Sequence, residues 1–198
     1  MKLYFNPLAC SLASRIAVYE GNREVEMIEV DTPTKRTSDG RDYRTVYPLG
    51  LVPALELPDG SVLTENAAVL QFLADAPADR RLQQWLCFVG TELHKWLAIL
   101  LDKTIAPEVR AYAIAKVQPR LDYTNRHLAE RPFLLGDYSV ADGYLFAVLN
   151  WLTVIPGPSV TAYPHLAAFH ARMLTRPAAK RAFDEERALY LAELNRAH

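Results

Sequence analysis

Cysteine is scarce in this chain: Cys10 and Cys87 are the only two among 198 residues. They do not form a Cys-x-x-Cys pair, and they lie in segments that we expect in different parts of the fold. A disulfide framework is therefore excluded, and a reducing, cytoplasmic environment is expected. The N-terminal residues also lack the apolar core and the small-residue cleavage site of a signal peptide.

Long apolar runs and an excess of one charge are also missing. Lys and Arg total 22 and Asp and Glu total 23, so the formal net charge of -1 produces no field that would gather nucleic acid or anionic lipid. No segment approaches the roughly 18 consecutive apolar residues that a membrane span requires. We therefore expect a soluble globular protein that binds neither nucleic acid nor membranes.

The first part of the chain contains short apolar runs that predict strands at 2–5, 25–31, 53–57 and 61–63. Apolar residues at helical spacing predict a helix over 11–20, which Gly21 ends. Strand, helix and strand in this order imply a parallel pair with a right-handed crossover. The turn sequence at 58–60 predicts an antiparallel hairpin from the last two strands, and Thr64 is expected to cap a closing helix.

A linker is expected at 76–81, and the pattern beyond it is helical throughout. Apolar residues at three-and-four spacing predict one long buried helix from Leu82 to Leu101. A second helix is expected over about 108–130, with Val109 on its buried stripe and with a kink or a break at Pro119.

Three further helix starts are predicted in the last third of the chain. Ser139 followed by Asp142 is close to a capping box, which would begin a helix that reaches about Val154. The last helices are expected after Pro164 and Pro177.

Cys10 is the first candidate site residue, because it lies between a predicted strand and the helix that follows. Unpaired N–H groups and the helix dipole favour an anion there, so a thiolate at this position has a lowered pKa. The equally open alternative is a small buried apolar residue, which cysteine usually is.

Two other signals indicate a peptide ligand. A cis Val52–Pro53 bond at the start of the third strand would open the N–H and C=O of Val52 to an extended peptide. The helix start at Glu65 and Asn66 can bind a ligand carboxylate through N–H groups while Glu65 faces an ammonium. A trans Val52–Pro53 bond, which is the commoner form, is the alternative for the first signal, and an ordinary capped helix with a first-turn acid is the alternative for the second. Together with Cys10 they describe sites for a sulfur, a peptide backbone and an amino-acid headgroup, which is the shape of glutathione.

Four stretches of sequence carry a family pattern in a fixed order: MKLYFNPLACSLASRIAVYE, YPLGLVPALELPDGSVLTENAAVLQFLAD, TELHK and FLLGDYSVADGYLF. They resemble the cytosolic glutathione transferases, and most closely their bacterial beta class. The resemblance implies an α/β plus all-α fold, with a thioredoxin-like domain of βαβαββα order at 1–76. An all-helical domain at 83–198 would contribute the electrophile site, and the family is typically a homodimer.

The resemblance also implies roles for individual residues. Cys10, Ser11 and His94 would act in catalysis, with Cys10 nearest the glutathione sulfur. The residues that it places around glutathione are Lys35, Leu51, Val52, Pro53, Glu65, Asn66, Thr91 and Lys95. Lys35 would meet the glycyl carboxylate, Val52 the cysteinyl backbone, and Glu65 with Asn66 the γ-glutamyl end.

The long helix gives partly independent support for a contribution from the helical domain. Cys87, Thr91 and His94 are four and three residues apart, so a regular helix would direct them together into a cleft between the domains. A solvated histidine, or one satisfied within the core, is the commoner alternative. No metal is expected, because the histidines and cysteines lack a ligand spacing.

The sequence departs from the family pattern at several positions. Leu8 stands where glycine is usual, Leu49 and Leu51 replace Lys and Gln, Asn66 replaces Ser or Gly, and Cys87 replaces Asn. The bulkier Leu8 would crowd the loop over the sulfur, and Leu49 and Leu51 leave that rim of the predicted site less polar.

We therefore expect a glutathione transferase that conjugates the glutathione thiolate to small hydrophobic electrophiles in detoxification, with glutathione as co-substrate and no metal. The alternatives are thiol–disulfide exchange through Cys10 and a noncatalytic binding protein on the same scaffold.

Overall fold

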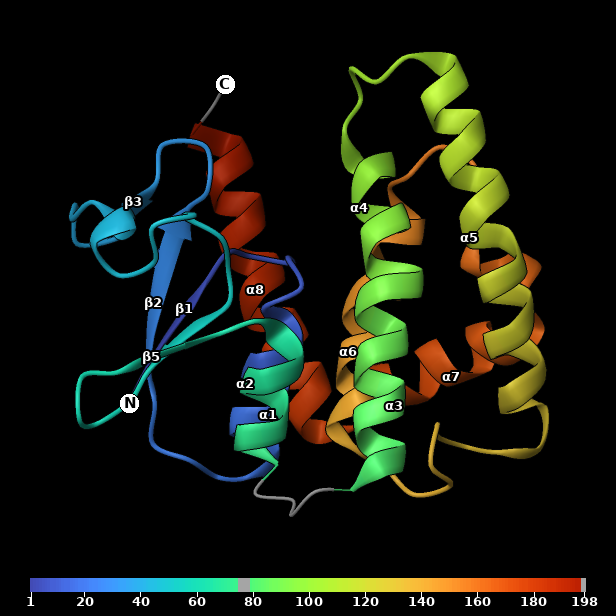
Figure 1. Ribbon diagram of the computed structural model, residues 1–198, viewed down its shortest axis with the longest axis horizontal. Helices are drawn as coiled ribbons and strands as arrows, with labels where there is room; N and C mark the ends of the chain where they lie inside the picture. Colours follow the sequence, from blue (N-terminus) through green and yellow to red (C-terminus); the bar gives the residue numbers. More distant parts are fainter. Residues whose placement is uncertain (75–78, 197–198) are drawn as a thin grey trace. The chain divides into compact units, whose positions relative to one another are not determined.

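The computed structural model describes residues 1–74 and 79–196, and the chain divides into two compact units. The sheet unit comprises Met1–Ala76 and Arg176–His198, and the helical unit comprises Pro77–Thr175 (Figure 1). The last helix, which the sequence assigned to a helical domain at 83–198, thus packs with the sheet unit. Of the predicted linker, 76–78 lie outside the described residues.

Within the described residues, a five-stranded mixed sheet has the order β3-β2-β1-β4-β5. The strands are β1 (Lys2–Phe5), β2 (Glu26–Asp31), β3 (Arg36–Thr37), β4 (Ala54–Glu56) and β5 (Val62–Thr64). β1 pairs parallel with β2 and antiparallel with β4, which in turn pairs antiparallel with β5. The parallel pair and the hairpin at 58–60 were both predicted, whereas β3 was not.

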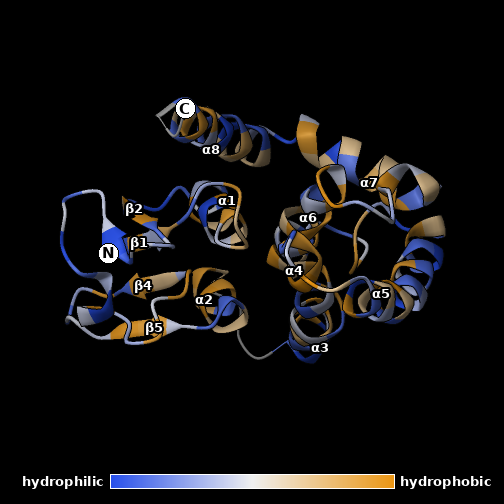
Figure 2. Cartoon of the chain, turned by 90° about the horizontal axis from the view of Figure 1, so that it is seen from above, coloured by the Kyte–Doolittle hydropathy of each residue, from blue (hydrophilic) through white to orange (hydrophobic). Residues whose placement is uncertain are grey.

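Side chains alternate along β1, so both faces of the sheet contribute to the core. Tyr4 is fully buried with Ile28 and Ala54, its neighbours in register on either side. Leu3 and its partner Leu55 are fully buried as well. Helices α1 (Leu12–Glu20) and α2 (Asn66–Leu73) pack side by side, and α8 (Pro177–Arg196) packs against α1 (Figures 1 and 2).

Two details of the sheet unit differ from expectation. Between β2 and β4 the chain forms β3 and the short 3-10 turn η1 (Tyr43–Thr45), where βαβαββα order implied a helix. The cap of α2 was predicted one residue early, because Thr64 ends β5 and Glu65 occupies the N-cap.

The long helix predicted from Leu82 to Leu101 has three parts in the structure. α3 (Arg80–Phe88) is capped by Asp79, whose carboxylate accepts the N–H groups of Arg81 and Leu82. A π-helical turn, η2 (Val89–His94), follows and leads into α4 (Lys95–Leu101). A π turn holds more residues per turn than an α-helix, so it shifts the faces of the residues that follow it.

α5 (Pro107–His127) continues through Pro119, so the helix is not broken there, and a kink at Pro119 stays a prediction. Pro119 lies on the exposed side of the helix, where water can satisfy the carbonyl that it leaves unpaired. The buried stripe contains Ala113, Val117 and Leu121 as expected. Val109, predicted on that stripe, is 46% exposed.

α6 (Val140–Asn150) is the central helix of the helical unit, because every one of its residues is buried. The predicted capping box is confirmed: Asp142 accepts the N–H of Ser139 at 2.8 Å. α7 (Pro164–Thr175) and the short turns η3 (Leu128–Glu130), η4 (Trp151–Thr153) and η5 (Val160–Ala162) complete the unit. No described helix is long and apolar enough to span a membrane.

Candidate functional site

Three residues around the predicted site have a left-handed backbone that L-amino acids rarely adopt. Leu8, Lys35 and Glu65 have φ values of 59°, 58° and 66°. Among the described residues other than glycine, Asn22 is the one further case, and asparagine tolerates this conformation in turns. Each strained residue costs roughly 1–2 kcal/mol, and such residues cluster at functional sites. Glu65 is itself a predicted site residue, Lys35 is one that the resemblance implied, and Leu8 lies two positions before Cys10.

Cys10 lies at the first corner, next to Ser11, which is the N-cap of α1. Its side chain is buried, and its Sγ donates to the carbonyl oxygen of Val52 at 3.3 Å. Burial raises the pKa of Cys10 to about 12 and outweighs the N–H groups of Cys10 and Ser11, which lower it. The expectation of a lowered pKa was therefore wrong, and the alternative of a buried cysteine is confirmed.

Ser11 does not reach the sulfur of Cys10 in this structure. Its hydroxyl accepts the N–H of Asn6 and donates to the carbonyl of Asn6, both at 3.2 Å. The side chain is fully buried. Ser11 therefore closes the turn that carries Cys10, and its role in catalysis stays a prediction.

Asn66 is likewise committed inside the unit. Its Nδ2 donates to the carbonyl of Cys10 at 3.0 Å, and its Oδ1 accepts the hydroxyl of Ser14 at 2.8 Å. The side chain thus ties the start of α2 to the start of α1. The residue nevertheless supplies a backbone N–H at the helix start.

Glu65 differs from its neighbour because its side chain is exposed and makes no capping bond. The first bond of α2 runs from the N–H of Val69 to the carbonyl of Glu65. The N–H groups of residues 66–68 therefore precede the helical ladder and can bind a carboxylate.

The strand edge beside Cys10 is formed by Leu51, Val52 and Pro53. The Val52–Pro53 peptide is cis, as predicted. Leu51 is 53% exposed, and its carbonyl accepts the hydroxyl of Tyr43 at 2.8 Å. Within the described residues the N–H of Val52 has no hydrogen-bond partner, so it can pair with an added peptide.

Lys35 reaches the same edge from the loop after β2. Its Nζ donates to the carbonyl of Gly50 at 2.8 Å. Gly50 has a φ of 61°, and a Cβ built there would lie 2.7 Å from the Cδ of Lys35. Glycine is thus required for two reasons, and the sequence pattern had given no signal for this role.

A continuous series of contacts therefore joins the predicted residues of the sheet unit. Lys35 bonds to Gly50, two residues before Val52; Val52 bonds to Cys10; and Cys10 bonds to Asn66, next to Glu65. An ammonium, an open backbone N–H, a thiol and a carboxylate consequently lie along one connected set of loops and helix starts.

The residues predicted in the helical unit are arranged differently. The Nδ1 of His94 lies 2.7 Å from the hydroxyl of Tyr144, and its ring packs against Trp151. Burial lowers the pKa of His94 to about 4, so the ring is neutral at neutral pH. The hydroxyl of Thr91 donates to the carbonyl of Cys87, while Lys95 is exposed.

The π turn explains why the predicted stripe of Cys87, Thr91 and His94 is not retained. The predicted stripe requires a regular α-helix, whereas Thr91 and His94 both lie within the π turn η2. Cys87 and Thr91 are exposed, and His94 is half-buried against α6. The partner Tyr144 was missed, because a contact 50 residues along the chain leaves no local signal.

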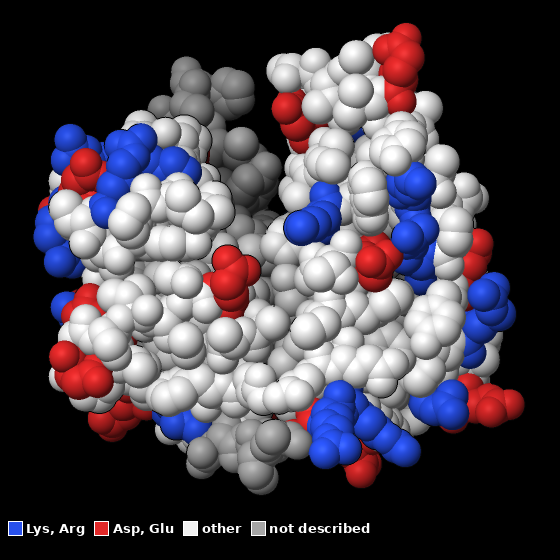
Figure 3. Space-filling model, viewed as in Figure 1, with Lys and Arg blue, Asp and Glu red and all other residues white. Residues whose placement is uncertain are grey.

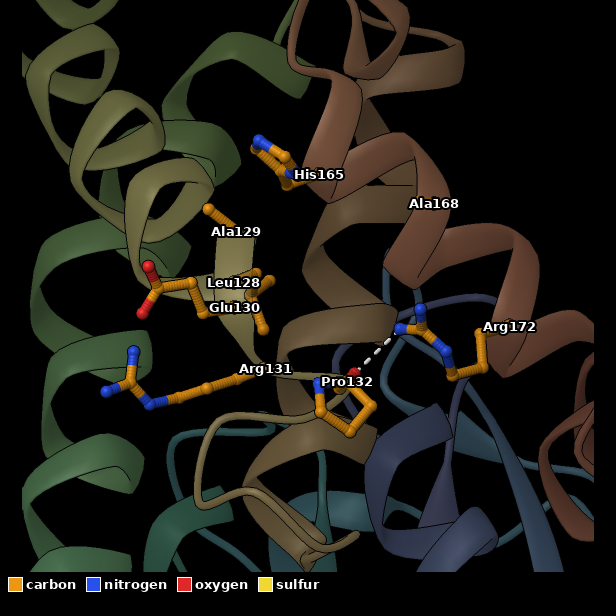
Figure 4. Close-up of a pocket in the computed structure, with 8 residues that line it drawn as sticks. All are labelled: Leu128, Ala129, Glu130, Arg131, Pro132, His165, Ala168 and Arg172. Atoms are coloured by element: carbon orange, nitrogen blue, oxygen red, sulfur yellow. Dashed lines mark hydrogen bonds between the residues drawn. The ribbon is translucent and has the colours of Figure 1, made fainter.

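A surface pocket of about 400 Å³ in the helical unit contains none of the predicted residues (Figure 4). It is lined by Leu128, Ala129, Glu130, Arg131, Pro132, His165, Ala168 and Arg172. Arg172 donates to the carbonyl of Pro132 at 2.7 Å, which ties α7 to the loop after η3. Acidic and basic side chains are interspersed on the face seen in Figure 3, and the described residues contain no metal-ligating cluster.

Comparison with known proteins identifies the family. The models described as the glutathione S-transferase N-terminal and C-terminal domains match residues 9–76 and 84–177. Glutathione S-transferase GstA of Escherichia coli O157:H7 is 37% identical over 199 residues, covering 94% of this chain and 98% of that protein.

Solved structures agree with this sequence relationship. A bacterial beta class enzyme of Sphingomonas chungbukensis matches with a TM-score of 0.88 at 36% identity, covering 94% of this chain and 98% of that one. A sphingomonad glutathione S-transferase complexed with glutathione matches with a TM-score of 0.89 at 38% identity, with the same coverage of 94% and 98%. The chain belongs to the glutathione S-transferase family and resembles its bacterial beta class.

Proposed function

We propose that this protein binds glutathione in the sheet unit and conjugates its thiolate to small hydrophobic electrophiles. The observation that carries the proposal is the left-handed backbone of Leu8, Lys35 and Glu65, which lie next to the predicted sulfur site, at the glycyl position that the resemblance implied and at the predicted headgroup site. Unfavourable backbone conformations persist only where the surrounding structure imposes them, and they cluster at ligand-binding and active sites.

Each end of a γ-linked tripeptide has a matching group in this arrangement. The ammonium of Lys35 suits the glycyl carboxylate, and the open N–H of Val52 suits the cysteinyl carbonyl. The exposed carboxylate of Glu65 suits the γ-glutamyl ammonium, while the N–H groups at the start of α2 suit its carboxylate.

The state of Cys10 favours conjugation over exchange through this residue. A buried cysteine whose pKa is raised to about 12 is a neutral thiol at neutral pH, and a thiol is not a nucleophile. Its single S–H donates to the carbonyl of Val52 in this structure, and it can turn from there to donate weakly to a glutathione sulfur bound beside it. Together with the N–H groups of the turn, this donor would stabilise the glutathione thiolate, which then attacks the electrophile.

The remaining expectations rest on the family. The roles of Thr91, His94 and Lys95 in binding glutathione stay predictions, as does the contribution of the helical unit to electrophile binding. We also propose a homodimer and a cytoplasmic location, in keeping with the related enzymes.

Isothermal titration calorimetry with glutathione tests the proposal. Wild type should bind at millimolar glutathione or below, and Glu65→Ala should weaken the affinity at least about tenfold, since an ionic hydrogen bond is lost. Glu65→Gln keeps the shape of the side chain and removes its charge, so its affinity shows how much of the effect comes from the charge. Glu26→Ala, which removes an exposed carboxylate from β2 of the same unit, is the matched control and should bind like wild type.

Two results would contradict the proposal. One is wild-type protein that gives no heat with glutathione. The other is a Glu65→Ala variant that binds as tightly as the Glu26→Ala control.

A further inference from the structure

Glu186 is a buried acid that takes no part in the proposed binding and conjugation of glutathione. It lies on α8, more than 170 residues from the turn that carries Cys10, and its side chain is fully buried. Its Oε2 nevertheless accepts the backbone N–H of Leu8 at 2.8 Å. Leu8 is one of the three strained residues, with a φ of 59°, and lies two positions before Cys10.

The turn from Asn6 to Cys10 is fixed at two points. At its base, the hydroxyl of Ser11 bonds to Asn6, and the N–H of Ala9 donates to the carbonyl of Asn6 at 3.1 Å. At its middle, the N–H of Leu8 bonds to Glu186. The second point comes from another element, so it holds the turn against α8.

The surroundings of Glu186 are poorly suited to a buried carboxylate. The guanidinium of Arg15 on α1 lies 3.9 Å away, which is too far for a hydrogen bond, and approaches Glu185 at 2.6 Å instead. The Oε1 of Glu186 and the Nη1 of Arg15 are buried without a hydrogen-bond partner among the described residues. Burial raises the pKa of Glu186 to about 8, with Arg15 lowering it and the charges of Glu185 and Glu29 raising it.

An apolar side chain would cost less than such a carboxyl group if packing were its only role. The bond to Leu8 supplies a different role, because a left-handed leucine is unfavourable without an external partner. We infer that Glu186 is a positioning residue: by holding the N–H of Leu8, it keeps the Asn6–Cys10 turn closed and the Cys10 thiol buried against Val52. Its relevance to catalysis rests on the proposed function, whereas its effect on Cys10 does not.

Alkylation of Cys10 by iodoacetamide, followed by mass spectrometry, measures the closure of the turn. All variants carry Cys87→Ala, which removes the exposed thiol of the helical unit. Glu186→Ala should speed Cys10 alkylation at least about tenfold over this parent, the size expected when a buried hydrogen bond is lost. Glu186→Gln, whose amide oxygen can still accept the N–H of Leu8, should stay within about threefold of the parent.

Glu185→Ala is the matched control, because it removes the neighbouring carboxylate that also bonds to Arg15 but not the bond to Leu8. It should stay close to the parent. Urea denaturation gives the free energy of unfolding of each variant, and hence the rate at which Cys10 would be alkylated if only the globally unfolded protein reacted. The measured alkylation rate of Glu186→Ala must exceed that rate. Glutathione KM should rise in Glu186→Ala and not in Glu186→Gln.

Three results would overturn the inference. They are a folded Glu186→Ala protein alkylated as slowly as the parent, a Glu186→Gln protein alkylated as fast as Glu186→Ala, and a rate that follows global unfolding alone. If Glu186→Ala does not fold, hydrogen exchange of the Leu8 amide in wild type decides: slow exchange supports the inference, and exchange at the rate of an open loop overturns it. Should wild type bind no glutathione, the proposed function fails while the alkylation series still decides the role of Glu186.

Discussion

The two units use their polar side chains in opposite ways. In the sheet unit, Lys35 and Glu65 sit at strained positions at the ends of elements, and buried neighbours such as Asn66 hold the backbone beneath them. In the helical unit, His94 and Asp142 are bonded inside the unit itself. Glu65 of the sheet unit is exposed and makes no capping bond, whereas His94 and Asp142 fix the helices of their own unit.

The largest expected effect contrasts the two cysteines. Cys10 has a pKa raised from 9.0 to about 12, so below pH 9 its thiolate fraction is about a thousandfold lower than that of an unperturbed cysteine. In wild type, iodoacetamide should therefore label the exposed Cys87 long before Cys10, and the labelling rate of Cys10 should still rise with pH above 9. Equal labelling rates for Cys10 and Cys87 at pH 7.5 would contradict the predicted difference between the two thiols.

The second effect concerns the internal bonds of the helical unit. Asp142 is fully buried and accepts the N–H groups of Leu134 and Ser139, each at 2.8 Å. Asp142→Ala should lower the free energy of unfolding by about 3 kcal/mol, because two buried donors lose their acceptor. Urea denaturation measures the loss. Glutathione affinity of the folded variant should stay at the wild-type level, and a variant that unfolds like wild type would argue against this use of the side chain.

A smaller effect tests the strained edge of the sheet unit. Gly50→Ala should lower the free energy of unfolding by roughly 1–2 kcal/mol, because a φ of 61° is unfavourable for alanine. It should also weaken glutathione binding, because the new Cβ, 2.7 Å from the Cδ of Lys35, displaces that side chain. Gly40→Ala is the control, since Gly40 also has a positive φ, of 85°, but no atom within 4 Å of the added Cβ. Both variants should lose stability, and Gly50→Ala alone should lose affinity by calorimetry.

The smallest effect is expected at His94. Its pKa, lowered to about 4 by burial, means that the ring carries no charge between pH 5 and 8. His94→Gln should therefore change glutathione affinity by less than about tenfold, the size of one neutral hydrogen bond. The pH profile of wild-type kcat/KM should show no ionisation that His94→Gln removes. Loss of such an ionisation near pH 6.5 would mean that the ring is not buried as described.

Local sequence signals predicted the parts of the fold that local chemistry controls. The turn at 58–60, the capping box at Ser139 and the stop after α1 each depend on residues adjacent in the chain, and all three appear in the structure. The π turn at 89–94 carries no comparable signal, so the face on which His94 lies was predicted from the wrong helical geometry.

The candidate site shows the same limit. The motifs identified Cys10, Val52 and Glu65, because each marks the end of an element. The spacing of residues could not show that Cys10 is buried, because Cys10 packs against residues more than 40 positions away. That burial is what raises its pKa. Nor could spacing find Glu186, which reaches the turn from the far end of the chain.

The central claim is that the strained corners of the sheet unit bind one molecule of glutathione. A crystal structure of the protein soaked with glutathione tests it most directly. We expect the cysteinyl backbone paired with Val52, the γ-glutamyl group at Glu65 and the start of α2, and the glycyl carboxylate near Lys35. Glutathione bound elsewhere on the sheet unit, or these groups left free at saturating glutathione, would contradict the claim.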